Sequence, residues 1–200
     1  MQRRRQPNPS QKKAPTGQVR IISGLWRGRK LPVHDAEGLR PTTDRVKETL
    51  FNWLAQEVPN ARCLDLFCLG SGGLGFECAS RQANQVTMLE LNPLAFQQLK
   101  TNVQSLKAEN IELIHTDALA FLRQSGKPYD VVFIDPPFRQ GLLQETTQLL
   151  EQNGWLAPQA MIYIECEKEL PLTELPPHWH LHREKSAGQV CYRLFIREEQ

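Results

Sequence analysis

The segment "DLFCLGSGGLGFE", residues 65–77, decides the fold of this 200-residue chain. Its first residues continue an apolar run that starts near Arg62 and is typical of a buried strand. Its glycines then let the backbone turn sharply before a helix begins. Open α/β sheets bind their ligands at such turns, at the carboxyl ends of the strands. The segment therefore predicts an α/β fold with a ligand site at this edge of the sheet.

Strand and helix patterns alternate along the rest of the chain. We expect strands at residues 62–67, 85–90, 111–115, 129–134 and 161–165, and helices near residues 74–82, 93–106, 118–125 and 142–152. Apolar strands separated by helices predict a parallel sheet that is covered on both faces. Residues 181–197 hold two β-prone runs joined by a turn without a helix, so the last strand is expected to run antiparallel.

The N-terminal region differs from the rest of the chain in charge. Residues 1–30 contain nine basic residues and no acidic residue, whereas the other 170 residues carry 15 basic and 22 acidic residues. We expect a disordered basic arm at residues 1–17 and a single domain at residues 18–200 that begins with a small basic hairpin extension, residues 18–40. A basic arm on an acidic body indicates attraction to a polyanion such as nucleic acid. A solvated tail that only aids solubility is the alternative.

The composition limits the class of protein. The apolar content of 40% suffices for a core, and the longest apolar stretches have only strand length, so we expect neither a membrane span nor a secretory signal. The five cysteines are scattered and never spaced as CxxC, which suits reduced thiols in a cytoplasmic protein. His178, His180 and His182 alternate without nearby cysteines or acids, and we expect no metal site.

Acidic residues recur at the ends of the first three expected strands. They are Asp65, Glu90 and Asp117. Glu90 can accept both hydrogen bonds from a ribose diol, and Asp117 follows the strand where the adenine amine of a nucleoside cofactor would lie. The glycine loop lets the backbone approach such a ligand closely at Gly70, Gly72 and Gly75. Together these residues predict a cofactor site.

A dinucleotide fingerprint is a competing interpretation of the same loop. Residues 70–75 satisfy GxGxxG, and Glu90 lies 20 residues beyond Gly70. Three features argue against a nicotinamide enzyme: Asp65 inside the first strand, the antiparallel final hairpin, and the sequence DPPF at residues 135–138. These features resemble the S-adenosylmethionine-dependent methyltransferases.

The fourth strand ends in an acid, two prolines and an aromatic ring, within "VVFIDPPFRQG", residues 131–141. The Asp135 carboxylate and the Pro136 carbonyl can accept the two N–H bonds of an exocyclic base amine, which favours a pyramidal nitrogen whose lone pair points at a methyl donor. Pro136 and Pro137 stiffen the turn, and Phe138 offers a face for base stacking. The motif predicts methyl transfer to a base. The alternative is that the prolines merely end a strand and Phe138 packs in the core.

Five segments of the chain together resemble one family of proteins. They are the glycine loop, DPPF, "RIISGLWRGRKL" (20–31), "LRPTTDRVKETLFNWL" (39–54) and "LHREKSAGQVCYRLF" (181–195). From about Val19 to the C-terminus the chain resembles the bacterial 16S ribosomal RNA guanine-N2 methyltransferases. The resemblance implies a Rossmann-like class I fold with a seven-stranded, mostly parallel sheet. It implies S-adenosylmethionine as the methyl donor and, as the acceptor, the N2 amine of a guanine in a protein-loaded small ribosomal subunit. It also implies a segment that closes over the cofactor, with Arg40, Thr42 and Thr43.

The basic hairpin is the predicted RNA contact, through Arg20, Trp26, Arg27, Arg29 and Lys30. We expect a monomer. Three other functions stay open: a DNA adenine or cytosine amino-methyltransferase, a glutamine amide methyltransferase, and a non-catalytic RNA-binding assembly factor. The lack of an obvious target-recognition domain favours RNA over DNA. The intact DPPF motif and glycine loop favour an enzyme.

One residue departs from the pattern of the family. Both Cys68 and Leu69 stand between Phe67 and Gly70, where the family has one residue. Because strand side chains alternate with period two, we expect the extra residue to form a local bulge just past the last paired residue. Asp65 should then stay near the cofactor site.

Overall fold

The computed structural model describes residues 17–34 and 42–198. The strands in this part of the chain are β1 (Gly17–Arg20), β2 (Lys30–Val33), β3 (Arg62–Asp65), β4 (Gln85–Glu90), β5 (Ile111–His115), β6 (Tyr129–Ile134), β7 (Leu156–Glu167), β8 (Trp179–Ala187) and β9 (Val190–Arg197). The helices are α1 (Asp44–Trp53), α2 (Gly73–Ser80), α3 (Pro93–Leu106), α4 (Ala118–Leu122) and α5 (Leu142–Gln152). None of the helices described is long and apolar enough to cross a membrane.

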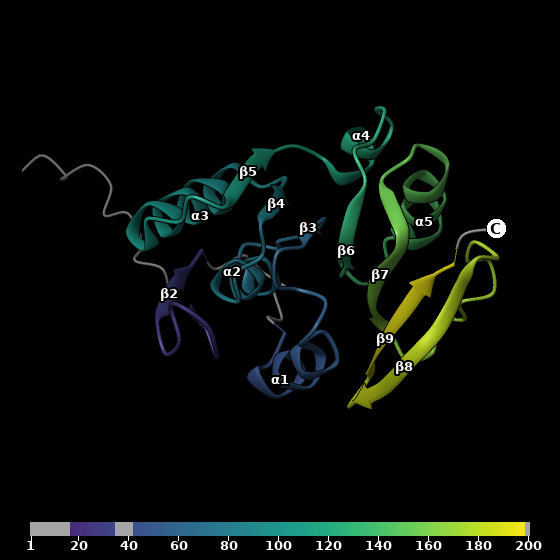
Figure 1. The fold of residues 1–200 in the computed structure, drawn as a ribbon, viewed down its shortest axis with the longest axis horizontal. Coiled ribbons are helices and arrows are strands. Elements are labelled where there is room, and N and C mark those ends of the chain that lie inside the picture. The colour runs from purple at the N-terminus through teal and green to yellow at the C-terminus, as the bar shows by residue number, and fades with distance from the viewer. Residues whose placement is uncertain (1–16, 35–41, 199–200) are drawn as a thin grey trace, which may run out of the picture.

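Seven strands form one sheet in the order β5-β4-β3-β6-β7-β9-β8 (Figure 1). The pairs from β5 to β7 are parallel, and β9 runs antiparallel to both of its neighbours, β7 and β8. The predicted α/β class, the mostly parallel seven-stranded sheet and the antiparallel final strand are therefore confirmed. The order of strands along the chain reverses between β3 and β6, which makes this the switch point where ligands of open α/β sheets bind.

Helices cover both faces of the sheet, as the apolar strands predict. Helices α1, α2 and α3 share one apolar core with the β1-β2 hairpin, whereas α4 and α5 pack against the opposite face (Figure 1). Successive strand residues alternate between these cores, because side chains of a strand point to opposite faces. Val131 and Phe133 face the first core, and Val132 and Ile134 face the second.

Local capping signals place the helix ends. Thr43 caps α1 by accepting the N–H of Val46, and Asn92 caps α3 with Pro93 in its first turn. Side-chain oxygens of Thr and Asn act as caps because they satisfy the free N–H groups of a helix start, and proline suits the first turn, where its missing N–H costs nothing. Two strands differ from their expected bounds. β3 ends at Asp65, although we expected it to reach residue 67, and β7 begins at Leu156, although we expected it to start at residue 161.

The extra residue lies in a turn that follows β3. Leu66 and Cys68 still donate to carbonyls of the two neighbouring strands, to Phe133 of β6 at 3.3 Å and to Leu89 of β4 at 3.2 Å. Leu69 then takes a left-handed conformation with φ 45°, which is costly for a branched residue. The regular strand therefore ends before the extra residue, and a turn takes the place of the expected bulge. Asp65, the last residue of β3, stays in register with Met88 of β4 and Phe133 of β6.

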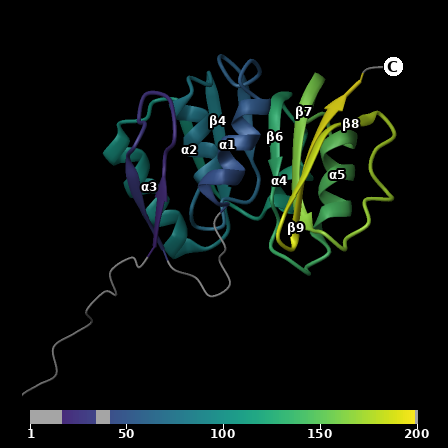
Figure 2. The ribbon, with the colours of Figure 1, turned by 90° about the horizontal axis from the view of Figure 1, so that it is seen from below.

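The hairpin predicted at the N-terminus is present as β1 and β2, beside α3 in Figure 2. Its loop docks on α2 through a buried carboxylate: Glu77, which is fully buried, accepts the N–H groups of Ile22 at 2.9 Å and Ser23 at 3.0 Å. A Cβ atom on Gly24 would lie 2.0 Å from the carbonyl oxygen of Ser80, so only glycine fits there. The hairpin is thus packed on the domain. The predicted arm at residues 1–17 lies outside the described residues, except for Gly17.

Candidate active site

The glycine loop turns tightly against β4. Gly72 precedes α2 in a left-handed conformation with φ 59°. A Cβ atom on Gly72 would lie 2.5 Å from the Met88 side chain, and one on Gly75 would lie 2.7 Å from it. At both positions a larger residue would have to displace the side chain of Met88, which is fully buried. Glycine therefore allows the close packing of the turn and of α2 on the sheet.

Asp65 ends β3 directly beneath this turn. It is 2% exposed, and its Oδ2 atom accepts the N–H of Gly75 at 3.1 Å. Burial raises the pKa of Asp65 to about 6, although the N–H groups of Gly75 and Phe67 and the thiol of Cys68 donate to the carboxylate and oppose the shift. Burial also raises the pKa of Cys68, so that its sulfur stays protonated as a donor.

Glu90 links the glycine loop to the next strand end. Its Oε2 atom accepts the N–H of Gly70 at 2.8 Å, and its Oε1 atom accepts the N–H of Asn92 at 2.8 Å. Asp117 is exposed and caps α4 by accepting the N–H of Ala120 at 2.8 Å. The three predicted cofactor carboxylates thus follow β3, β4 and β5, which are consecutive neighbours in the sheet.

A second group of side chains lies on the other side of the switch point, just after β6 and near the carboxyl end of β7. The hydroxyl of Thr42 lies 3.4 Å from Oδ2 of Asp135 and 3.5 Å from Oε2 of Glu165. Tyr163, fully buried, donates its hydroxyl to the same Oε2 atom at 2.7 Å. Burial and the nearby charge of Glu165 raise the pKa of Asp135 well above its usual range. The site therefore contains a pair of carboxylates that share one hydroxyl group.

The remaining residues of the predicted catalytic motif surround this pair. Pro136 is buried and Pro137 half-buried. Phe138 is 41% exposed, so it does not pack in the core and its ring is accessible to a ligand. The backbone after it is anchored by Arg139, whose N–H donates to Oε1 of Glu167 at 2.7 Å. Of the predicted cofactor segment, Thr42 joins the carboxylate pair, Thr43 caps α1, and Arg40 lies outside the described residues.

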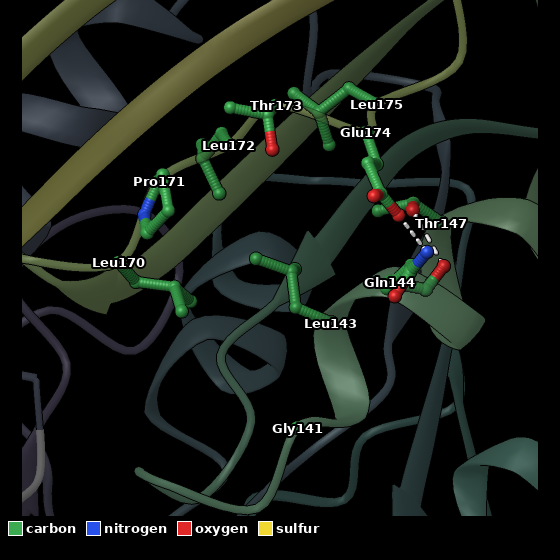
Figure 3. A pocket seen from close by; sticks show the side chains of 10 residues that line it. All are labelled: Gly141, Leu143, Gln144, Thr147, Leu170, Pro171, Leu172, Thr173, Glu174 and Leu175. Carbon is green, nitrogen blue, oxygen red and sulfur yellow. Dashed lines mark hydrogen bonds between the residues drawn. The ribbon is translucent and has the colours of Figure 1, made fainter.

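An apolar groove of about 270 Å³ lies between the start of α5 and the loop that follows β7. Figure 3 shows Leu143 and Gln144 of α5 opposite Leu172 and Leu175 of the loop, with a hydrogen bond from Gln144 to Glu174. Both segments follow carboxyl ends of strands. The sequence patterns did not predict this groove.

The predicted RNA-binding residues divide into two groups. Arg27, Arg29 and Lys30 are exposed, and we call them the basic strip. Trp26 is half-buried and packs against the core, and Arg20 forms an ion pair with Asp44 at 2.8 Å. Within the described chain, no group of three His, Cys, Asp or Glu residues is placed to hold a metal ion. The five cysteines are buried and free.

Two buried carboxylates with long-range contacts were not predicted from the sequence. Glu165 was assigned only to a strand, and Glu77 only to a helix, yet both are buried acids. Acidic residues inside apolar runs are the available signal, because a carboxylate is rarely buried without partners.

The fold and the two groups of carboxylates define a Rossmann-like methyltransferase. One group lies beside the glycine loop, with Asp65 and Glu90 at the ends of β3 and β4 and Asp117 just after β5. The other group holds Asp135 of DPPF, just after β6, and Glu165, near the end of β7. The antiparallel strand β9 completes the sheet of this class.

Comparison with known proteins places the chain within a family. Residues 19–196 match the family model described as conserved hypothetical protein 95. The chain is 57% identical to the ribosomal RNA small subunit methyltransferase D of Escherichia coli K12, over 92% of this chain and 93% of that protein. It is 55% identical to the protein of the same name from Haemophilus influenzae, over 90% and 94% of the two chains. The solved structure of yhhF from Escherichia coli, 55% identical, superimposes with a TM-score of 0.87 over 92% of this chain and all of that one. The chain belongs to the family of ribosomal RNA small subunit methyltransferases.

Proposed function

We propose that the protein transfers a methyl group from S-adenosylmethionine to the N2 amine of a guanine in 16S ribosomal RNA, within a protein-loaded small subunit. The observation that carries the proposal is the position of Asp135, at the switch point of the sheet and next to the cofactor-side carboxylate Asp65. Family membership supports ribosomal RNA as the acceptor, and we infer a cytoplasmic site of action for the same reason.

The residues present fit S-adenosylmethionine. Glu90 and Asp65 are acidic acceptors for a ligand that carries hydroxyl groups and positive charge, and the glycine turn leaves the backbone close to them. S-adenosylmethionine supplies the methyl group on a sulfonium. Carboxylates on the cofactor side and on the target side of one switch point allow a donor and an acceptor to meet there.

The chain itself positions the acceptor amine. The Asp135 carboxylate and the Pro136 carbonyl accept its two N–H bonds, so that the nitrogen lone pair faces the methyl group. Phe138 stacks on the base, and its exposure supports this role. Because the pKa of Asp135 is raised, its carboxylate is also suited to take the proton that the amine must lose after transfer.

Incubation with labelled S-adenosylmethionine tests the proposal. The protein should be given, in separate reactions, protein-loaded small subunits, naked 16S RNA and duplex DNA. We expect label in the small subunits, and N2-methylguanosine after digestion of their RNA. Label in duplex DNA, or in a different nucleoside, would contradict the proposed target. Label in naked RNA but not in subunits would contradict the proposed assembly state.

The basic strip should contribute to RNA affinity by neutralising phosphates. Replacing Arg27, Arg29 and Lys30 with alanine should weaken RNA binding and flatten its salt dependence, by about 0.7 to 0.9 units of the log-log slope for each phosphate that is no longer neutralised. Binding is to be measured over a salt series. Lys127→Ala, at an exposed position before β6, is the control and should leave the slope unchanged. An unchanged slope in the triple variant would mean that these residues do not bind phosphates.

A further inference from the structure

Glu165 is a buried acid that the methyl-transfer step described above does not use. It lies in β7, the strand that pairs with β6, and the pairing of the two strands ends at Ile134 and Ile164. Asp135 and Glu165 follow these two residues directly, so the two carboxylates come just after the last pair of neighbouring parallel strands, while β7 continues to Glu167 along β9. Glu165 is 8% exposed, whereas Asp135 is partly exposed.

Tyr163 and Thr42 both contact the Glu165 carboxylate. Tyr163 donates to Oε2 at 2.7 Å from a fully buried position, and burial raises the pKa of Tyr163, so this hydroxyl stays a donor. Thr42 lies 3.5 Å from the same oxygen and 3.4 Å from Asp135. Hydroxyl hydrogen bonds are usually about 2.7 to 2.8 Å long, so the Thr42 contacts are weak and an incoming donor can replace them.

Two neighbouring carboxylates favour a ligand that presents adjacent donors. The charge of Glu165 disfavours ionisation of Asp135, and N–H or O–H donors that reach both carboxylates reduce this repulsion. Ionised carboxylates accept hydrogen bonds and donate none. The Watson–Crick edge of guanine carries the N1–H donor directly beside the two N2–H donors. Adenine has an acceptor at N1. This nitrogen would face a carboxylate oxygen, which is also an acceptor, and no hydrogen bond could form between them.

We propose that Glu165 selects guanine by accepting the N1–H of the target base while Asp135 accepts an N2–H. This inference rests on the proposed function and deepens it. Asp135 orients the reacting amine, and Glu165 determines which base is accepted. Tyr163 acts as a positioning residue, because it holds the acceptor oxygen of Glu165 toward the end of the sheet.

The test compares guanine with 2-aminopurine at the target position. 2-Aminopurine keeps the N2 amine, but it has an acceptor at N1 in place of the donor that Glu165 would bind, and it has no O6 atom. The methylated position is first mapped with the wild-type enzyme, and small subunits are then assembled with ligated 16S RNA that carries either base there. The readout is the ratio of kcat/KM for guanine to kcat/KM for 2-aminopurine.

We expect the wild-type enzyme to prefer guanine by roughly 10- to 100-fold, the usual discrimination of a well-placed hydrogen bond to a base. In Glu165→Gln the side-chain amide offers an N–H donor near N1. This donor can bond to the N1 acceptor of 2-aminopurine but faces the N1–H of guanine, so the ratio should fall by about 10-fold or more. Glu165→Asp keeps the charge, but its shorter side chain places the carboxylate oxygens farther from the base. Its ratio should lie between those of the wild type and of Glu165→Gln. This second variant keeps the test decisive if Glu165→Gln does not fold.

Glu184→Gln is the matched control, because this exposed carboxylate on β8 contacts Arg193, a residue of the neighbouring strand. Its ratio should equal that of the wild type. If the wild type methylates guanine and the ratio is unchanged in both Glu165 variants, Glu165 only stabilises the fold and the inference is wrong. If the wild type methylates no guanine at all, the proposed function itself fails.

Discussion

Asp135→Ala should lower the rate of methyl transfer by roughly two to four orders of magnitude, the usual effect of removing a positioned acid–base or polar group. The affinity for S-adenosylmethionine should stay within about a few-fold of the wild-type value, because the predicted cofactor contacts follow β3, β4 and β5 and not β6. The rate is measured by single-turnover label transfer, and the affinity by calorimetry.

The lower rate should not come from unfolding. Burial and the charge of Glu165 raise the pKa of Asp135, so ionising this carboxyl group costs more free energy in the folded protein than in the unfolded chain. Removing the carboxylate therefore relieves an unfavourable interaction. S-adenosylmethionine should raise the melting temperature of both proteins, and NAD should raise that of neither.

A control on the same strand separates the motif from general charge effects. Asp130→Ala removes an exposed carboxylate of β6 that accepts the N–H of Arg62 at 2.8 Å, at the end of the strand away from the site. Its turnover should be close to normal. Near-normal turnover in Asp135→Ala would show that Asp135 does not position the acceptor amine.

Asp65→Asn should change the pH dependence of stability. Burial raises the folded-state pKa of Asp65 to about 6, above its ordinary value of 3.8, so the folded protein binds a proton more tightly than the unfolded chain. The folded state is therefore favoured at low pH and loses stability as the pH rises from about 4 to 6. At pH 7 this contribution is fully lost, which corresponds to a cost on the order of 3 kcal/mol.

Asparagine does not titrate, so the variant does not lose stability through ionisation of this side chain as the pH rises. The free energy of unfolding of Asp65→Asn relative to the wild type should increase by about 2 kcal/mol between pH 4 and pH 7, because part of the cost is already present at pH 4. Urea unfolding at a series of pH values measures the difference, and other titrating groups cancel in the comparison. The affinity for S-adenosylmethionine should fall in the same variant, because Asp65 is a predicted cofactor contact. A difference in unfolding free energy that does not vary with pH would show that Asp65 ionises normally in the folded protein.

Much of the fold was predictable because its signals are local. Strands β4, β5 and β6 and helices α3 and α5 have the residue bounds expected from apolar periodicity. The cap at Asn92 and the glycine turn before α2 involve only a few neighbouring residues each. The end of β3 was placed two residues too late, because the apolar residues after Asp65 continue a strand pattern while the backbone already leaves the ladder.

The sequence alone determined the α/β class, the acidic residues at successive strand ends that we predict to bind the cofactor, and the acid, prolines and aromatic ring that follow β6. These features depend on residue types and short spacings, because apolar periodicity, glycine turns and proline turns act within a few neighbouring residues. Only the tertiary structure decided which distant residues meet. Thr42 reaches Asp135 and Glu165 across 93 and 123 positions of sequence, and Glu77 holds a hairpin loop 54 and 55 positions away. No local pattern encodes these contacts, because they depend on strand order and on how the hairpin and α1 pack across the sheet.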